Sequence, residues 1–194
     1  MRETSFEVRA TLFTIIGVLT EERIAHAFIG ALPVLAWGRV RATTDIDLVV
    51  IVADDDWPRL RTALARHGIV QRRQVGPADR TDALPDIAVL YSAGDLPVRL
   101  DLYIAKTDFE RAVVETARRA SVLGETICLA RPEASIIYKL LAQRPRDIDD
   151  VDSIFEARRV AGERLDWEFL EQWAEAWGIR DRLAPYQAKY QLAR

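Results

Sequence analysis

The chain has very little of what disulfides and zinc sites require. Its 194 residues include one cysteine, Cys128, and two histidines, His26 and His67. A single cysteine forms no internal disulfide, and no second ligand stands at the spacing of a zinc site. We therefore expect a protein of a reducing compartment, the cytoplasm, without structural zinc. The two histidines are interpreted as residues at helix ends.

Long apolar runs and lysines are scarce as well. The apolar run at residues 12–19 is interrupted by Thr14 and Gly17 and is too short to cross a bilayer, so we expect no membrane partner. Most basic residues are arginines, and the net charge is −3. This charge gives no global attraction to nucleic acid, although a local basic patch can still bind phosphate.

What the chain does have is ample apolar material for one core, because 49% of its residues are hydrophobic. The predicted helices span residues 6–24, 31–37, 57–67 and 109–117, and the predicted strands span residues 27–29, 45–52, 69–75, 87–91 and 98–104. With residues 76–85 as a loop, this pattern predicts an α/β fold of the α+β type. A mixed sheet of five strands is flanked by helices, and residues 125–130 are expected to add an edge strand.

From Pro132 onward the pattern is helical, and no strand is expected. Pro132 begins a helix, Pro145 is expected to end it, and Asp147 is placed to cap the next one. Near the end of the chain, Trp173 and Trp177 stand four positions apart. We expect them to pack a terminal helix onto the rest of the molecule.

A pair of carboxylates, Asp45 and Asp47, begins the second predicted strand. Residues two apart in a strand point to the same face, about 6 to 7 Å from each other, so both carboxylates can aim at one point. Oxygen ligands of this kind suit Mg²⁺ or Mn²⁺, which neutralise phosphate charge during transfer reactions. An isolated pair of this kind also occurs at solvated strand ends, so its surroundings decide its meaning.

A third acidic residue, Asp101, lies in the otherwise apolar run Val98-Arg-Leu-Asp-Leu-Tyr-Ile. A charge in such a strand is costly unless it has a partner, and a metal ion would be one. The alternative is a half-exposed strand on which Asp101 faces outward and pairs with Arg99. Both interpretations stay open at this point.

Upstream of the pair, Gly30 stands where a strand turns into a short helix, and a residue without Cβ lets a phosphate approach the backbone there. Between that turn and Asp45 lie Arg39, Arg41, Thr43 and Thr44, which are placed to contact a triphosphate. The arginines are equally well explained as surface cations that balance the aspartates.

These residues carry a resemblance to a known family. Gly30-Ala31, a short helix and then Gly-Arg-Val-Arg-Ala-Thr-Thr-Asp-Ile-Asp at residues 38–47 resemble the signature of the DNA polymerase β-type nucleotidyltransferase superfamily. Within it, the chain is similar to the AbiEii and MenT toxin-type group and to minimal nucleotidyltransferases. The likeness continues through Arg-Leu-Asp-Leu-Tyr at residues 99–103 and through the segment from Lys139 to Asp150, so that it covers about residues 27–155.

The resemblance implies a nucleotidyltransferase fold and a metal-dependent enzyme that moves a nucleoside monophosphate from an NTP and releases pyrophosphate. It assigns Mg²⁺ or Mn²⁺ to Asp45, Asp47 and Asp101, and it makes these three and Lys139 the catalytic residues. The nucleotide-binding residues that it implies are Gly30, Ala31, Arg41, Thr44, Lys139, Asp147 and Asp150. From the residues alone, Lys139 fits a long side chain at a helix surface, and Asp147 and Asp150 fit a helix cap.

The resemblance also implies partners. Toxin-type relatives modify RNA, especially tRNA, and can have a cognate antitoxin protein, whereas other relatives modify small molecules such as aminoglycosides. The chain departs from the family at Ala31, where serine or glycine is usual, which keeps open a catalytically silent member that binds nucleotide or an antitoxin. A phosphodiesterase that uses the same aspartates to activate water is a third possibility.

We expect a catalytic domain at residues 1–130 and a helical segment at residues 131–194 that contributes to the cleft.

Overall fold

The computed structural model describes residues 2–75 and 86–191. Its elements in chain order are α1 (Arg2–Glu21), β1 (Ala25–Ile29), α2 (Ala31–Trp37), β2 (Asp45–Ile51), α3 (Trp57–Arg66), β3 (Ile69–Val75), β4 (Asp86–Ser92), β5 (Arg99–Ile104), α4 (Asp108–Glu115), β6 (Arg118–Val122), β7 (Glu125–Leu129), α5 (Pro132–Ala142), α6 (Pro145–Val160), α7 (Trp167–Ala176), α8 (Arg180–Tyr186) and a π-helical turn, η1 (Gln187–Gln191). The predicted loop at residues 76–85 lies outside the described residues.

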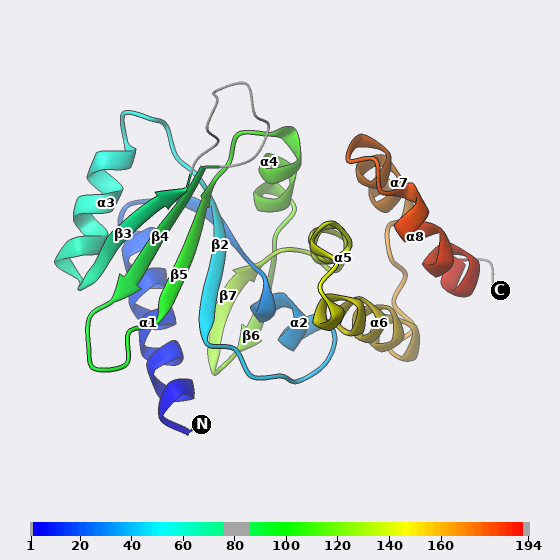
Figure 1. Ribbon diagram of the computed structural model, residues 1–194, viewed down its shortest axis with the longest axis horizontal. Coiled ribbons are helices and arrows are strands. Elements are labelled where there is room, and N and C mark those ends of the chain that lie inside the picture. Colours follow the sequence, from blue (N-terminus) through cyan, green and yellow to red (C-terminus); the bar gives the residue numbers. More distant parts are fainter. Residues whose placement is uncertain (1, 76–85, 192–194) are drawn as a thin grey trace.

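The strands form one mixed sheet in the order β3-β4-β5-β2-β1-β7-β6, with helices on both faces (Figure 1). The pairs β2–β5 and β1–β7 are parallel, and the other pairs are antiparallel. The predicted α/β class with a mixed, helix-flanked sheet is therefore confirmed.

The prediction of five strands with an added edge strand was incomplete. Residues 125–130 do form a strand, β7, but it lies between β1 and β6, and β6 is the edge. Its sequence, Arg-Arg-Ala-Ser-Val, lacks the apolar alternation that marks a half-buried strand. The exposed arginines at its start suit a free edge, because charged side chains oppose pairing with another chain.

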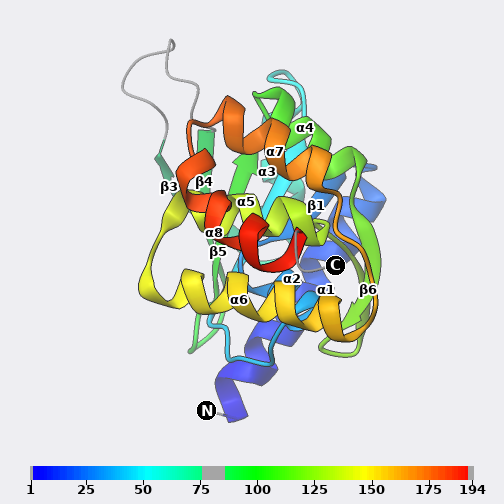
Figure 2. The ribbon, with the colours of Figure 1, turned by 90° about the vertical axis from the view of Figure 1, so that its right-hand side faces the viewer.

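The two faces of the sheet are covered by different helices, and this positions the site. Alternate residues such as Ile46, Leu48 and Leu102 are fully buried in a core that they share with α1 and α3. The opposite face packs partly against α4 and against the layer of α5, α6, α7 and α8, which Figure 2 shows in front of the sheet. At the N-terminal ends of β2 and β5, this second face is not fully covered, and polar side chains line it.

Two details of the N-terminal half differ from the expectation. The first helix ends at Glu21, and β1 begins at Ala25 rather than at residue 27, so His26 lies in a strand and not at a helix end. His26 interrupts the apolar run at the start of β1, so the sequence pattern indicates a shorter strand, but the antiparallel register with β2 runs from Ala25 opposite Ile51. His67 does lie at a helix end, because it caps α3.

The prediction for Pro145 was wrong. Helix α5 ends at Ala142, where Gln143 adopts a left-handed conformation with φ of 50°, and Pro145 is the first residue of α6. A proline is favourable there because that position needs no backbone N–H donor. Asp147 is consequently inside the first turn of α6 rather than a cap residue, although its carboxylate accepts a hydrogen bond from the Arg144 backbone N–H at 3.1 Å.

The C-terminal part is helical from Pro132 onward throughout the described residues, as predicted. The ring of Trp173 packs against Phe109 with a centroid distance of 5.0 Å, and Trp177 contacts the same ring at 6.1 Å. The two tryptophans therefore pack α7 onto α4, as expected. Among the described helices, none is both long enough and apolar enough to cross a membrane.

Candidate active site

The strand registers bring the three aspartates together. In the parallel pair of β2 and β5, Asp47 lies opposite Asp101 and Asp45 lies opposite Arg99. On the other side of β2, Asp47 lies opposite Ile29, the residue before Gly30. All three carboxylates line one open cavity of about 320 Å³, together with Gly30 and Ala31.

Gly30 is required at its position for two reasons. Its φ of 69° lies in the left-handed region that favours glycine, and a Cβ there would stand 2.1 Å from Oδ2 of Asp47. The Asp47 carboxylate therefore packs directly against the turn that begins α2. Ala31, the first residue of α2, is buried, with 4% of its surface exposed.

The carboxyl group of Asp47 is strongly perturbed by its surroundings. Burial raises its pKa to about 7, and the charges of Asp45 and Asp101 add to this, while Lys139 and Arg144 oppose it. Within the described part of the chain, its carboxylate has no hydrogen bond or ion pair. A bound cation would compensate this charge, so the oxygen donors at this point fit a divalent metal ion.

Asp45 is held by a threonine of the loop that leads into β2. The Thr43 hydroxyl lies 2.9 Å from the carbonyl oxygen and 3.0 Å from Oδ1 of Asp45, and it can donate to either. The predicted nucleotide-binding residue Thr44 is exposed and does not line the cavity. Thr43, rather than its neighbour, therefore orients the carboxylate.

Asp101 is paired with Arg99 on the same face of β5. The guanidinium Nε and Nη2 of Arg99 donate to the two carboxylate oxygens, both at 2.8 Å. The ion pair that was open as an alternative is thus present, and yet both residues line the cavity. No three acidic, histidine or cysteine side chains of the described residues are arranged as a ready metal cluster. A metal ion would rely on Asp45, Asp47 and phosphate oxygens of a substrate.

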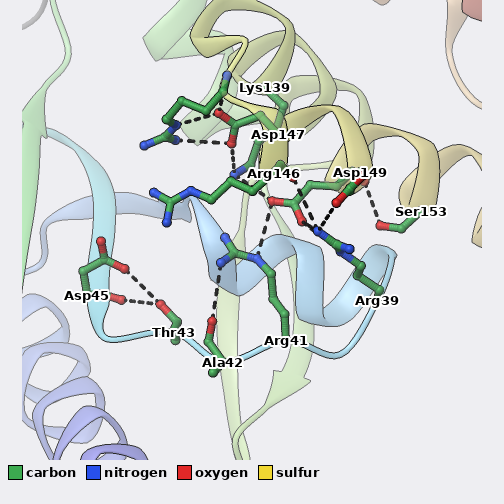
Figure 3. A network of polar contacts seen from close by, with 12 residues as sticks. Arg39, Arg41, Ala42, Thr43, Asp45, Lys139, Arg146, Asp147, Asp149 and Ser153 are labelled. Carbon is green, nitrogen blue, oxygen red and sulfur yellow. Dashed lines mark hydrogen bonds and ion pairs between the residues drawn. The ribbon is translucent and has the colours of Figure 1, made fainter.

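Lys139 lies at the inner wall of the cavity, between two buried carboxylates of α6 (Figure 3). Its Nζ is 2.9 Å from Oδ1 of Asp147 and 3.1 Å from Oδ2 of Asp150. Both aspartate side chains are fully buried. Although burial would raise the pKa of Asp147, hydrogen bonds from Arg144 and Lys139 lower it below its usual value. The structure thus brings these three predicted residues together, but the sequence did not indicate that they would pair with one another.

The two arginines of the loop between α2 and β2 also turn toward α6. The Arg39 Nε donates to Oδ1 of Asp150 at 3.2 Å, and the Arg41 Nε lies 3.4 Å from Oδ2. These ion pairs therefore hold the loop that leads to Asp45 against α6 through Asp150. The arginines balance carboxylates, as the alternative interpretation held, but those carboxylates belong to α6.

Besides Arg99, four polar residues that line the cavity were not among the predicted site residues: Tyr103, Tyr138, Arg144 and Arg146. Tyr103 stands two positions after Asp101, so strand alternation could have placed it on the same face. Burial, followed by the charges of Asp47 and Asp101, raises the pKa of Tyr103. The two arginines flank Pro145 at the start of α6, and only the packing of α6 against the sheet brings them to the cavity.

The sequence as a whole matches a protein family. Residues 8–182 match the family described as "Nucleotidyl transferase of unknown function (DUF2204)". No protein of curated function matches the chain.

Solved structures share the fold. One is an antigenic nucleotidyltransferase-like protein from Paracoccidioides brasiliensis, which is 21% identical over 77% of this chain and 76% of that one, with a TM-score of 0.52. Another is the antibiotic-resistance factor ANT(2'')-Ia, 18% identical over 94% and 96% of the two chains, with a TM-score of 0.56. Its complex with adenylyl-2''-tobramycin is 17% identical over 90% and 97%, with a TM-score of 0.55. At these identities the likeness establishes the fold.

Proposed function

The chain belongs to the nucleotidyl transferase family DUF2204, and we propose that it moves a nucleoside monophosphate from an NTP to an acceptor hydroxyl and releases pyrophosphate. The observation that carries this proposal is the meeting of Asp45, Asp47 and Asp101 with Gly30 in one open cavity. The predicted division into a catalytic domain (residues 1–130) and a helical segment (residues 131–194) is part of the proposal, because residues of both line the cavity.

In this proposal Asp45 and Asp47 hold Mg²⁺ or Mn²⁺, which when bound supplies positive charge to the triphosphate. Asp47 is suited to this role because it is half-buried and has no hydrogen bond or ion pair to a cation among the described residues. Gly30 leaves its side of the cavity open, so that phosphate oxygens can approach the backbone at the start of α2. Direct contact of the triphosphate with Ala31, Arg41, Thr44 or Lys139 stays a prediction.

In this proposal Asp101 acts as the base for the acceptor hydroxyl. The acceptor oxygen forms a bond to the α-phosphorus of the NTP, the bond from that phosphorus to the pyrophosphate oxygen breaks, and the hydroxyl proton passes to the Asp101 carboxylate. Arg99 must first release this carboxylate, and half of its side chain is exposed, so it has room to move. The protein lowers the barrier by alignment and by charge compensation.

The arginines at the rim of the cavity support an anionic acceptor. Five cations line the cavity, namely Arg41, Arg99, Lys139, Arg144 and Arg146, and a guanidinium that pairs with a carboxylate still has N–H donors for a phosphate. RNA, including tRNA, fits such a rim better than a polycationic aminoglycoside does. This is the acceptor expected of a cytoplasmic toxin-type enzyme with a cognate antitoxin, as the likeness to the AbiEii and MenT group suggests.

A small-molecule acceptor is the second candidate. The fold neighbour ANT(2'')-Ia is solved with adenylyl-2''-tobramycin, and it matches this chain over most of its length. An acceptor of this kind predicts label transfer to aminoglycosides and none to RNA, so one assay separates the two.

Replacing Asp47 with Asn tests the proposal. We expect transfer from α-labelled NTP to a pool of tRNA and aminoglycosides, in Mg²⁺ or Mn²⁺, to fall by a factor of roughly 1,000 or more, because the metal loses a charged ligand. The label identifies donor and acceptor together. The matched control is Asp55→Asn, which changes the same charge at an exposed residue before α3.

Retained transfer in the Asp47→Asn variant, with the control also active, contradicts the assignment. Nucleotide binding without pyrophosphate release by the natural chain indicates the catalytically silent alternative, for which Ala31 is the main support. Release of nucleoside monophosphate from nucleic acid without added NTP indicates the phosphodiesterase.

A further inference from the structure

Four of the five cations that line the cavity already face a carboxylate. The pairs are Arg41 with Asp150, Arg99 with Asp101, Lys139 with Asp147 and Asp150, and Arg144 with Asp147. The fifth, Arg146, is exposed, and over residues 2–75 and 86–191 its guanidinium has no ion pair or hydrogen bond. The charge of Arg146 is therefore available to a ligand.

The family resemblance implies that Lys139 binds the triphosphate, but the position of Lys139 makes it costly to break its ion pairs with Asp147 and Asp150. Only 4% of its surface is exposed, and its ammonium group lies within 3.1 Å of carboxylate oxygens of both Asp147 and Asp150. Moving the ammonium to a phosphate would leave fully buried carboxylates with less compensation, which is strongly unfavourable. Lys139 thus stabilises the wall of the cavity.

The position of Arg146 is fixed relative to the metal-binding aspartates. It is the second residue of α6, directly after Pro145, and its carbonyl oxygen accepts a hydrogen bond from Arg39 Nη2 at 3.5 Å. Arg39 belongs to the loop that leads to Asp45, so this contact joins the start of α6 to that loop. Figure 3 shows the Arg146 side chain extending from α6 toward the side on which Asp45 lies, with no contact drawn from its guanidinium.

We infer that Arg146, rather than Lys139, binds the phosphate oxygens of the donor NTP in the cavity. The inference rests on the proposed function and assigns its substrate-binding cation. A guanidinium presents two parallel N–H donors that match phosphate oxygens. Because the Arg146 side chain is exposed, it can adjust to a triphosphate that a metal ion at Asp45 and Asp47 would hold. The contact is to phosphate and carries no preference among bases.

Calorimetric titration with inorganic triphosphate and Mg²⁺ tests the inference without knowledge of the preferred base. We expect Arg146→Gln to weaken this binding about 10- to 100-fold, the effect of losing one charge-assisted contact. The four nucleoside α,β-methylene triphosphates should lose affinity to the same extent. Because Arg146 is exposed, the thermal midpoint of unfolding should stay that of the natural chain.

The matched control is Arg180→Gln on α8, which removes the same charge from an exposed side chain whose partner is Glu175. It should bind inorganic triphosphate like the natural chain. Equal affinities of the Arg146→Gln variant and the natural chain would overturn the inference while leaving the proposed function intact. Unchanged triphosphate binding with weakened binding of a single-stranded RNA oligonucleotide would overturn it in favour of an acceptor contact. If the natural chain itself bound no triphosphate, the proposed function would fail first.

Discussion

The surroundings of Asp47 oppose the ionisation of its carboxyl group. Its carboxylate is half-buried, faces two further aspartates and packs against Gly30. In the absence of a cation, the folded chain therefore favours the protonated form of a group that water would ionise. A ligand that supplies positive charge would relieve this cost.

The pH dependence of the free energy of unfolding should reveal the raised pKa of Asp47. The pKa of Asp47 is about 7 in the folded chain, against an ordinary value of 3.8. Between these values the folded state retains a proton that the unfolded state has released, so this group lowers the free energy of unfolding as pH rises from about 4 to 7. We expect Asp47→Asn to raise the thermal midpoint of the metal-free protein at pH 8 and to change it little at pH 4.

Differential scanning calorimetry in EDTA at the two pH values measures the effect, with Asp55→Asn as the control. The expected difference at pH 8 is on the order of a few kcal/mol. Saturating Mg²⁺ should stabilise the natural chain more at pH 8 than at pH 4. An equal gain from Asp47→Asn at both pH values would show that the effect is not one of ionisation.

At the scale of elements, the contact between α2 and α6 holds the two ends of the site together. Gly38 follows α2 and leaves room for α6, since a Cβ there would stand 2.5 Å from the Ser153 hydroxyl oxygen and 3.1 Å from Ile154. Helix α2 begins at the Gly30 turn, and α6 begins with the arginines of the cavity wall. Close packing of these helices therefore holds the Gly30 turn and the start of α6, which both line the cavity, in fixed relative positions.

A pair of glycine substitutions tests this contact. We expect Gly38→Ala to lower the free energy of unfolding by roughly 1–3 kcal/mol, because the added methyl group overpacks the helix contact. Gly17→Ala in α1 meets nothing within 4 Å and should stabilise the protein by about 0.5–1 kcal/mol through helix propensity. Urea denaturation of both variants gives the comparison. If Gly38→Ala left the free energy of unfolding unchanged, α6 would be able to shift and accommodate the added methyl group.

Helices and strands with a clear periodicity of apolar residues were predictable from the sequence, and those without such a periodicity were not. The β-branched run of β2 and the strand β3, Ile69–Val75, were placed correctly, because apolar period and turn residues agree there. Strand β6 was missed because its arginines hide it. Pro145 was assigned to the end of a helix because a proline gives the same local signal at a helix start, and the left-handed Gln143 that ends α5 has no sequence mark.

At the scale of the whole molecule, the N-terminal and C-terminal parts share a core. Val49 of the sheet and Phe109 of α4 belong to the same buried cluster as Ile137, Val151 and Phe155 of the helical segment. The motif near Asp45 singled out residues that the structure brings to one cavity, while their function stays a prediction. The ion pairs between the loop and α6 were not, because they depend on how the helical layer docks on the sheet.

Truncation tests how far the two parts depend on each other. A chain of residues 1–130 would expose the face of the sheet that α5 to α8 cover, and we expect it to bind 1-anilinonaphthalene-8-sulfonate and to unfold without a sharp transition. The full chain should unfold in one transition by circular dichroism and by tryptophan fluorescence. A cooperative transition for residues 1–130 would instead establish an independent domain.

The parallel pairing of β2 with β5 has a consequence for the order in which the chain folds. Asp47 and Asp101, which lie opposite each other in that pair, are 54 positions apart in the sequence. Closing so long a loop is slow compared with forming the neighbouring antiparallel strands β3, β4 and β5, whose contacts are more local. The carboxylates thus meet only after this long-range closure, so that, as the protein is synthesised, β5 must be complete before the cavity between the three aspartates and Gly30 exists.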